Sequence, residues 1–115
     1  MKNNLVNQVV ELIEDKFAKR INVIDFERTN PFTDYFVVCD VDSNRQIDAI
    51  VNEVIKQSKE GKIDFRAIDG KSDSGWVVID LYDVVLHVFD KNIREVYELD
   101  KLFMNHPQTL KADVQ

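Results

Sequence analysis

The 115-residue sequence predicts a single α/β domain built on a mixed β-sheet of about five strands with flanking helices. Apolar residues recur at helical spacing in two long segments, 4–18 and 47–55. Short runs rich in β-branched residues, typical of strands, lie at 21–27, 34–41, 64–69 and 76–89. A chain of this length buries one core, so we expect one domain over residues 1–115, with flexible ends at 1–3 and 107–115.

The first predicted helix carries a wide apolar stripe and therefore faces a core. The stripe consists of Leu5, Val6, Val9, Val10, Leu12, Ile13 and Phe17. After this helix, INVIDFE at 21–27 and DYFVVCDV at 34–41 are joined by a loop that contains Pro31, and they predict an antiparallel pair. In the second strand, side-chain alternation gives both faces apolar residues, so we expect this strand at the centre of the sheet.

Ser43 and Gln46 match the S-x-x-Q capping box, which predicts the start of a second helix. Its apolar positions continue at helical spacing until Gly61 ends it. A short strand at 64–69, a turn-rich loop, the last hairpin and short helices near 92–103 complete the order. We expect both long helices on one face of the sheet and the short C-terminal helices on the other.

The run WVVIDLYDVVLHVF at 76–89 predicts two strands that fold back at 81–83. One face of this hairpin is an aliphatic core set: Val77, Ile79, Leu81, Val84, Leu86 and Val88. The opposite face carries Trp76, Val78, Val85, His87 and Phe89. The second set is more apolar than a solvated surface requires, and contact with another protein is one way to cover it.

The net charge of −6 and the sequence pI near 4.8 argue against a large nucleic-acid footprint, which needs clustered Lys and Arg, and favour a basic partner. No apolar run approaches the length of about 18 residues needed to cross a bilayer. Glu11, Glu14 and Asp15 interrupt any signal-peptide core, so we expect a cytoplasmic protein. Cys39 lies among valines and is expected to be a buried thiol rather than a nucleophile.

Asp40 and Asp42 form an Asp-x-Asp pair, of the kind that holds a metal ion, at the end of a strand. A polymerase-type nucleotidyltransferase site needs a Gly-Ser pair at a helix N-terminus before such carboxylates, whereas the order here is reversed. The sequence contains no glycine-rich phosphate loop, and His87 and His106 lack metal-ligand spacing. We therefore expect no enzyme, cofactor or metal site. A magnesium-dependent nucleotidyltransferase using Asp40 and Asp42 is the alternative.

Five segments that follow one another along the chain carry a family resemblance. They are DYFVV at 34–38, SNRQ at 43–46, GWVVID at 75–80, DVVLHVF at 83–89 and REVYELDKLF at 94–103. Together they resemble the ribosomal silencing factors, also called Iojap-like proteins. The resemblance implies a nucleotidyltransferase-like α/β fold without nucleotidyltransferase activity. It also implies binding to the ribosomal protein numbered fourteen on the intersubunit face of the large subunit, which sterically blocks subunit joining and lowers translation when nutrients are scarce.

Two segments depart from the family pattern. The residues DVD at 40–42 stand where the family often has Thr-Gly-Asn, so the Asp-x-Asp pair is a local variation. The residues LYD at 81–83 stand where Tyr-Gly-Asp is common. Because the loss of glycine disfavours a positive φ, we expect a wider hairpin than in relatives.

The candidate partner-binding residues lie on the second face of the hairpin and on the helices after it. They are Trp76, Asp83, His87, Phe89, Arg94, Tyr97 and Leu102. Asp83, His87 and Arg94 are expected to form a polar cluster beside Trp76. For Trp76 and His87, a structural place in the core is the competing interpretation. The resemblance implies the large ribosomal subunit as partner, with little or no direct nucleic-acid contact and no membrane; a homodimer of the free protein is a further alternative.

Overall fold

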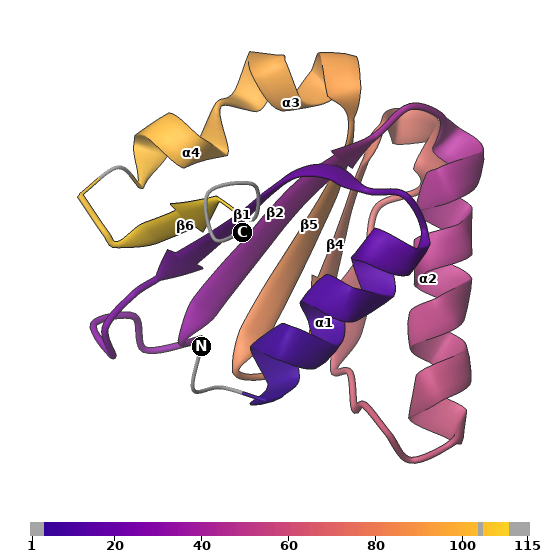
Figure 1. The fold of residues 1–115 in the computed structure, drawn as a ribbon, viewed down its shortest axis with the longest axis horizontal. Coiled ribbons are helices and arrows are strands. Elements are labelled where there is room, and N and C mark those ends of the chain that lie inside the picture. Colours follow the sequence, from indigo (N-terminus) through magenta and orange to yellow (C-terminus); the bar gives the residue numbers. More distant parts are fainter. Residues whose placement is uncertain (1–3, 104, 111–115) are drawn as a thin grey trace.

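A computed structural model describes residues 4–103 and 105–110 and shows a six-stranded sheet between two pairs of helices (Figure 1). The chain order is α1 (Asn4–Asp15), β1 (Lys19–Asp25), β2 (Tyr35–Val41), α2 (Asn44–Lys59), β3 (Ala67–Asp69), a 3-10 turn η1 (Ser72–Ser74), β4 (Trp76–Asp80), β5 (Val84–Asp90), α3 (Lys91–Tyr97), α4 (Leu99–Leu102) and β6 (Gln108–Leu110). The predicted α/β fold class is confirmed.

Strands β2 and β5 run parallel at the centre of the sheet, whose strand order is β3-β4-β5-β2-β1-β6. All other neighbouring strands in this order are antiparallel. Val37 of β2 lies opposite Val23 of β1 on one side and Leu86 of β5 on the other. The predicted antiparallel pair and the central position of its second strand are both confirmed.

The edge strand β6 pairs with β1 at a place where the sequence analysis expected a flexible end. The side-chain amide of Asn22 donates to Gln108 Oε1 at 2.8 Å and reinforces this pairing. The expectation is wrong for residues 108–110, because the backbone groups along the outer edge of β1 need partners and β6 supplies them. Residues 1–3 and 111–115, also expected to be flexible, lie outside the described part of the chain.

Helices α1 and α2 cover one face of the sheet, and α3 and α4 cover the other, as predicted (Figure 1). The larger core lies under α1 and α2 and contains the aliphatic face of the β4–β5 hairpin. The smaller core lies under α3 and α4 and is mostly aromatic. Among the described residues, no helix combines the length and the apolar character that a membrane crossing requires.

Helix α2 begins where the capping box predicts. Gln46 Oε1 accepts a hydrogen bond from the backbone N–H of Ser43 at 3.1 Å, which is the return half of the box. The same oxygen accepts from the N–H of Asp42 at 3.1 Å. The helix ends at Lys59, and Gly61 follows at φ 76, a left-handed conformation that glycine adopts without strain. The strand-to-helix junction after β2 is therefore held by side-chain hydrogen bonds.

The β4–β5 hairpin turns tightly at Tyr82 and Asp83. The N–H of Leu81 donates to the Val84 carbonyl at 2.8 Å, so strand pairing continues up to these two residues. Tyr82 adopts φ 74, and its N–H donates to Asp80 Oδ1 at 2.9 Å. The expectation of a wider hairpin is wrong, because the Asp80 side chain stabilises the turn in place of a glycine.

Candidate protein-docking face

Aromatic rings gather between the sheet and helices α3 and α4. We call this group the aromatic cluster; its members are Phe26, Phe36, Trp76, His87, Phe89, Tyr97 and Phe103. Neighbouring ring centroids lie between 4.4 and 6.3 Å apart, in edge-to-face, tilted and stacked arrangements. Strand alternation directs the members on β2, β4 and β5 to this face, opposite the aliphatic core. Contacts of this kind stabilise a core beyond the area that they bury.

Trp76 sits at the boundary between the aromatic cluster and the surface. Its ring stacks on Phe89 at 4.9 Å and contacts Tyr97 at 4.4 Å. Phe89 is fully buried, Trp76 is partly buried and Tyr97 is 51% exposed. Trp76 therefore packs against the buried Phe89 as a core residue does, and part of its ring also remains accessible to a partner. The structure is compatible with both interpretations of Trp76, as a core residue and as a partner-binding residue.

His87 is a buried hydrogen-bond acceptor inside the cluster. The indole N–H of Trp76 donates to His87 Nδ1 at 3.3 Å, which assigns the proton of the neutral imidazole to Nε2. His87 is 6% exposed, and this burial lowers its pKa from 6.5 to about 4. The imidazole is therefore neutral at pH 7 and contributes a structural hydrogen bond to the cluster rather than a charge.

Acidification is expected to destabilise the fold through His87. The folded-state pKa of about 4 lies below the unfolded value of 6.5, so the unfolded chain binds more protons between them. The free energy of unfolding should fall as the pH drops through this window, by about 3 kcal/mol in total from His87. Urea unfolding of the parent and of His87→Asn, which keeps an acceptor for Trp76, measures this. If the free energy of unfolding falls by the same amount in both proteins between pH 7 and pH 4.5, the loss does not come from protonation of His87.

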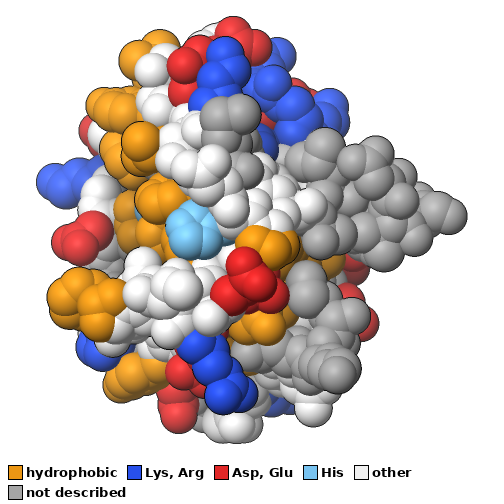
Figure 2. Space-filling view, turned by 90° about the vertical axis from the view of Figure 1, so that its left-hand side faces the viewer, with side chains coloured by type: hydrophobic (Ala, Val, Ile, Leu, Met, Phe, Trp, Pro, Cys, Tyr) orange, Lys and Arg blue, Asp and Glu red, His pale blue; other side chains and the backbone are white. Residues whose placement is uncertain are grey.

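Large apolar side chains remain exposed above the aromatic cluster, on α3 and α4. Val96 is 73% exposed, Tyr97 51% and Leu102 70%. We call these three residues the docking face. A view onto the β6 side of the molecule shows hydrophobic side chains interspersed with polar and charged ones (Figure 2). Large apolar side chains that stay exposed are typical of the centre of a protein–protein contact surface.

The expected polar cluster of Asp83, His87 and Arg94 does not exist. Arg94 is 6% exposed and pairs with Asp40 at 3.3 Å, and it also donates to the Arg20 carbonyl. Asp83 is exposed in the turn before β5, at the opposite end of the strand from α3. The sequence prediction is wrong because the parallel register of β2 and β5 brings Asp40 level with Phe89, and so within reach of α3. Arg94 anchors α3 to the sheet.

The Asp-x-Asp pair of the nucleotidyltransferase alternative is used by ion pairs. Asp40 Oδ2 accepts from Arg20 as well as from Arg94, while Asp42 pairs with Lys19 at 2.9 Å. Among the described residues, no group of three or more His, Cys, Asp or Glu side chains could hold a metal ion. Within the described residues, the two carboxylates therefore have no third His, Cys, Asp or Glu side chain placed to complete a metal site.

Cys39 lies in the middle of β2 and is fully buried. Burial raises the pKa of its thiol to about 12, so the thiolate needed by a nucleophile does not form near pH 7. The prediction of a buried thiol is confirmed.

Part of the aromatic cluster was not among the candidate residues. Phe26, Phe36 and Phe103 contact one another, with Phe26 and Phe36 edge-to-face at 4.9 Å, and Phe36 joins them to the predicted His87 at 4.5 Å. Phe36 carried a usable signal, since alternation in β2 directs it away from the aliphatic core. Phe103 belongs to the apolar set of the C-terminal helices, for which the sequence left core and docking surface both open, and its contacts depend on how the chain turns after α4. Val96, the most exposed residue of the docking face, was also left out of the candidate set.

Comparison with known proteins shows the family of the chain. The family described as "Ribosomal silencing factor during starvation" matches residues 1–115. The chain belongs to this family. The resemblance noted in the sequence is thereby confirmed, and so is a role as a ribosomal silencing factor in translation regulation.

Individual relatives of this silencing factor agree with the family match. The Ribosomal silencing factor RsfS of Bacillus subtilis is 38% identical over 94 residues, which cover 82% of this chain and 80% of the relative. A mouse protein named Mitochondrial assembly of ribosomal large subunit protein 1 is 32% identical over 101 residues, covering 85% of this chain but 44% of its own length. Both matches span more than four fifths of this chain.

A solved structure of a protein from Bacillus halodurans has the same fold. Its TM-score is 0.78 at 33% identity, and the match covers 92% of this chain and 96% of that one. A protein from Chromobacterium violaceum is similar, with a TM-score of 0.79 at 28% identity over 96% of this chain and 93% of its own. The arrangement of the sheet and helices is therefore shared with these proteins.

Proposed function

We propose that this silencing factor binds the large ribosomal subunit through the ribosomal protein numbered fourteen and sterically blocks joining of the small subunit, so that translation falls under nutrient limitation. The observation that carries the proposal is the family match over residues 1–115. The name of the mouse relative, which refers to assembly of the ribosomal large subunit, supports a large-subunit partner. In this proposal the protein has no catalytic role and acts by occupying the surface of the large subunit that the small subunit would otherwise contact.

The docking face supports a direct protein contact in this proposal. Tyr97 and Leu102 expose large apolar surfaces that a partner would cover, and Trp76 lies directly beneath Tyr97. The net charge of −6 favours a basic partner surface over ribosomal RNA. Phe89 and Arg94 are buried and hold the face in shape, whereas Asp83 lies at the far end of β5 and takes no part in it.

Co-sedimentation with purified ribosomal particles tests the proposal. The protein should pellet with free large subunits and should not pellet with small subunits or with joined ribosomes. Prior incubation of large subunits with the protein should lower the fraction of joined particles in a sucrose gradient after small subunits are added. Equal binding to joined ribosomes and free large subunits would contradict steric blocking.

A second copy of the chain is the competing occupant of the docking face. Sedimentation velocity over a range of protein concentrations separates the two cases. If the face is buried between copies, the Tyr97→Ala variant should remain monomeric at concentrations where the parent dimerises. If the amount of protein bound to large subunits rises in proportion to the concentration of monomer, self-association and ribosome binding compete for the same surface.

A further inference from the structure

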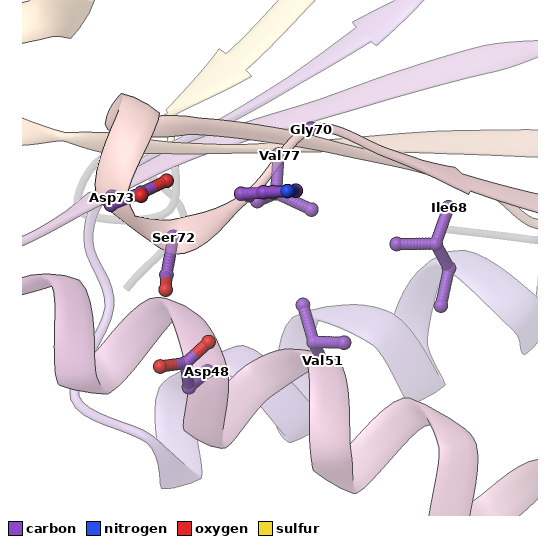
Figure 3. Close-up of a pocket in the computed structure, with 8 residues that line it drawn as sticks. Asp48, Val51, Ile68, Gly70, Ser72, Asp73 and Val77 are labelled. Atoms are coloured by element: carbon purple, nitrogen blue, oxygen red, sulfur yellow. The ribbon is translucent and has the colours of Figure 1, made fainter.

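A groove lies between α2 and the β3 edge of the sheet (Figure 3). Helix α2 covers the face of the sheet opposite α3 and α4, which carry the docking face (Figure 1). Its volume is about 420 Å³. Apolar side chains from three elements line it: Val51 of α2, Ile68 of β3 and Val77 of β4. Val51 and Ile68 face each other across the opening at one end (Figure 3). This end of the groove can take an aliphatic side chain.

The free edge of β3 lies beside the groove. In the described part of the chain, β3 pairs with β4 alone and is the last strand of the sheet. Such an edge presents backbone N–H and C=O groups to which a further strand can bind. Ala67 and Asp69 are exposed, whereas Ile68 points into the groove. A strand added to β3 would therefore direct alternate side chains into the groove beside Ile68.

Carboxylates occupy the other end of the groove. Asp48 and Asp73 approach it from α2 and η1, with the Ser72 hydroxyl between them (Figure 3). No described residue forms an ion pair with either carboxylate. Lys71 is the only cationic side chain that lines the groove in the described residues. The surplus of negative charge at this end favours a lysine or arginine of a ligand.

The connection between β3 and η1 passes close to β4 and forms part of the groove wall. Gly70 has φ 92, and a Cβ added there would lie 2.4 Å from the Trp76 carbonyl oxygen. The chain therefore passes close to β4 at a point where only glycine fits. Gly75 adopts φ 80 at the end of η1 and leads directly into β4.

We propose that the groove and the β3 edge bind an extended, basic segment of a partner protein. The segment pairs with β3 as an additional strand, inserts an aliphatic side chain between Val51 and Ile68, and places a lysine or arginine against Asp48 and Asp73. This surface is distinct from the docking face and does not depend on the ribosomal contact proposed above.

NMR titration of the ¹⁵N-labelled chain with a defined probe tests the proposal. The probe is the acetylated, amidated peptide Lys-Val-Lys-Val-Lys, and the matched control is Glu-Val-Glu-Val-Glu. The lysine peptide should cause saturable shifts of the amide signals of 48–51 and 66–73, and the glutamate peptide should not. Equal shifts with both peptides, no saturable shifts with the lysine peptide, or shifts confined to the docking face would each overturn the proposal.

Variants and modified peptides separate strand addition from simple charge attraction. The exposed double variant Asp48→Lys, Asp73→Lys should fold normally, judged by its amide spectrum, and bind the lysine peptide at least about tenfold more weakly. Peptides N-methylated on alternate residues should differ, because only one of the two registers removes the N–H groups that face β3. Equal affinity of both methylated peptides would refute strand addition. Concentration-dependent shifts of 66–73 without peptide would assign the edge to a second copy and overturn the proposal.

Discussion

Asp40→Ala is expected to lower the free energy of unfolding by about 3–5 kcal/mol, the usual cost of removing one partner of a buried ion pair. Asp40 is 2% exposed, and its Oδ2 accepts from both Arg20 and Arg94. Without this carboxylate the Arg94 guanidinium, on a residue that is 6% exposed, loses its buried counter-ion. Urea unfolding monitored by circular dichroism gives the free energy directly.

Asp42→Ala is the matched control from the same Asp-x-Asp pair. Its partner Lys19 lies at 2.9 Å, but both side chains are substantially exposed, so the expected loss is about 0–1 kcal/mol. The double variant Asp40→Leu, Arg94→Met should be less destabilised than the sum of the two single variants, since no charge is left buried. Equal losses for Asp40→Ala and Asp42→Ala would show that the buried pair contributes no special stability.

Magnesium separates this structural role from the nucleotidyltransferase alternative. If the two carboxylates held a metal ion, millimolar magnesium would raise the unfolding temperature of the parent, because a ligand that binds the folded state stabilises it. The same addition would leave Asp40→Ala unchanged. If Asp40 instead serves as the ion-pair partner of Arg20 and Arg94, magnesium should leave the unfolding temperature of both proteins unchanged.

Periodicity predicted most of the fold, because burial leaves its mark on side-chain type. The spacing of apolar residues located α1 and α2, and alternation assigned both faces of the β4–β5 hairpin correctly. The strand β6 carries no such mark: three residues, Gln108–Leu110, follow a proline and depend on the edge of β1 for their backbone partners. The periodicity of apolar residues does not reveal elements that are stabilised by backbone pairing rather than by burial of side chains.

The candidate site was predicted in part for a related reason. Alternation brought Trp76, His87 and Phe89 to one face, where the structure joins them in the aromatic cluster. The partner of Arg94 could not be found in this way, since Asp40 lies 54 positions away and meets it only through the β2–β5 register. Tertiary register decides which charged groups pair, and local sequence does not contain it.

Tyr97→Ala and Leu102→Ala are each expected to weaken binding to the large ribosomal subunit by about 2 kcal/mol or more, the usual scale for a central contact residue. Tyr97 is 51% exposed and Leu102 is 70% exposed, so neither truncation opens a core cavity. Trp76→Ala should weaken binding as well, but it also removes the ring that stacks on Phe89 at 4.9 Å and should cost stability. Co-sedimentation at several protein concentrations, with thermal unfolding of each variant, measures both effects.

Two controls decide whether these effects belong to the docking face. Phe17 is 76% exposed at the turn after α1, away from α3 and α4, so Phe17→Ala should bind large subunits like the parent. Leu86 is fully buried in the aliphatic core, and Leu86→Ala should lose about 2–5 kcal/mol of folding free energy through the cavity that it leaves. If Tyr97→Ala and Leu102→Ala stay folded and bind like Phe17→Ala, the docking face is not the ribosome-binding surface. If they unfold like Leu86→Ala, these residues belong to the core and the exposed apolar set needs no partner to explain it.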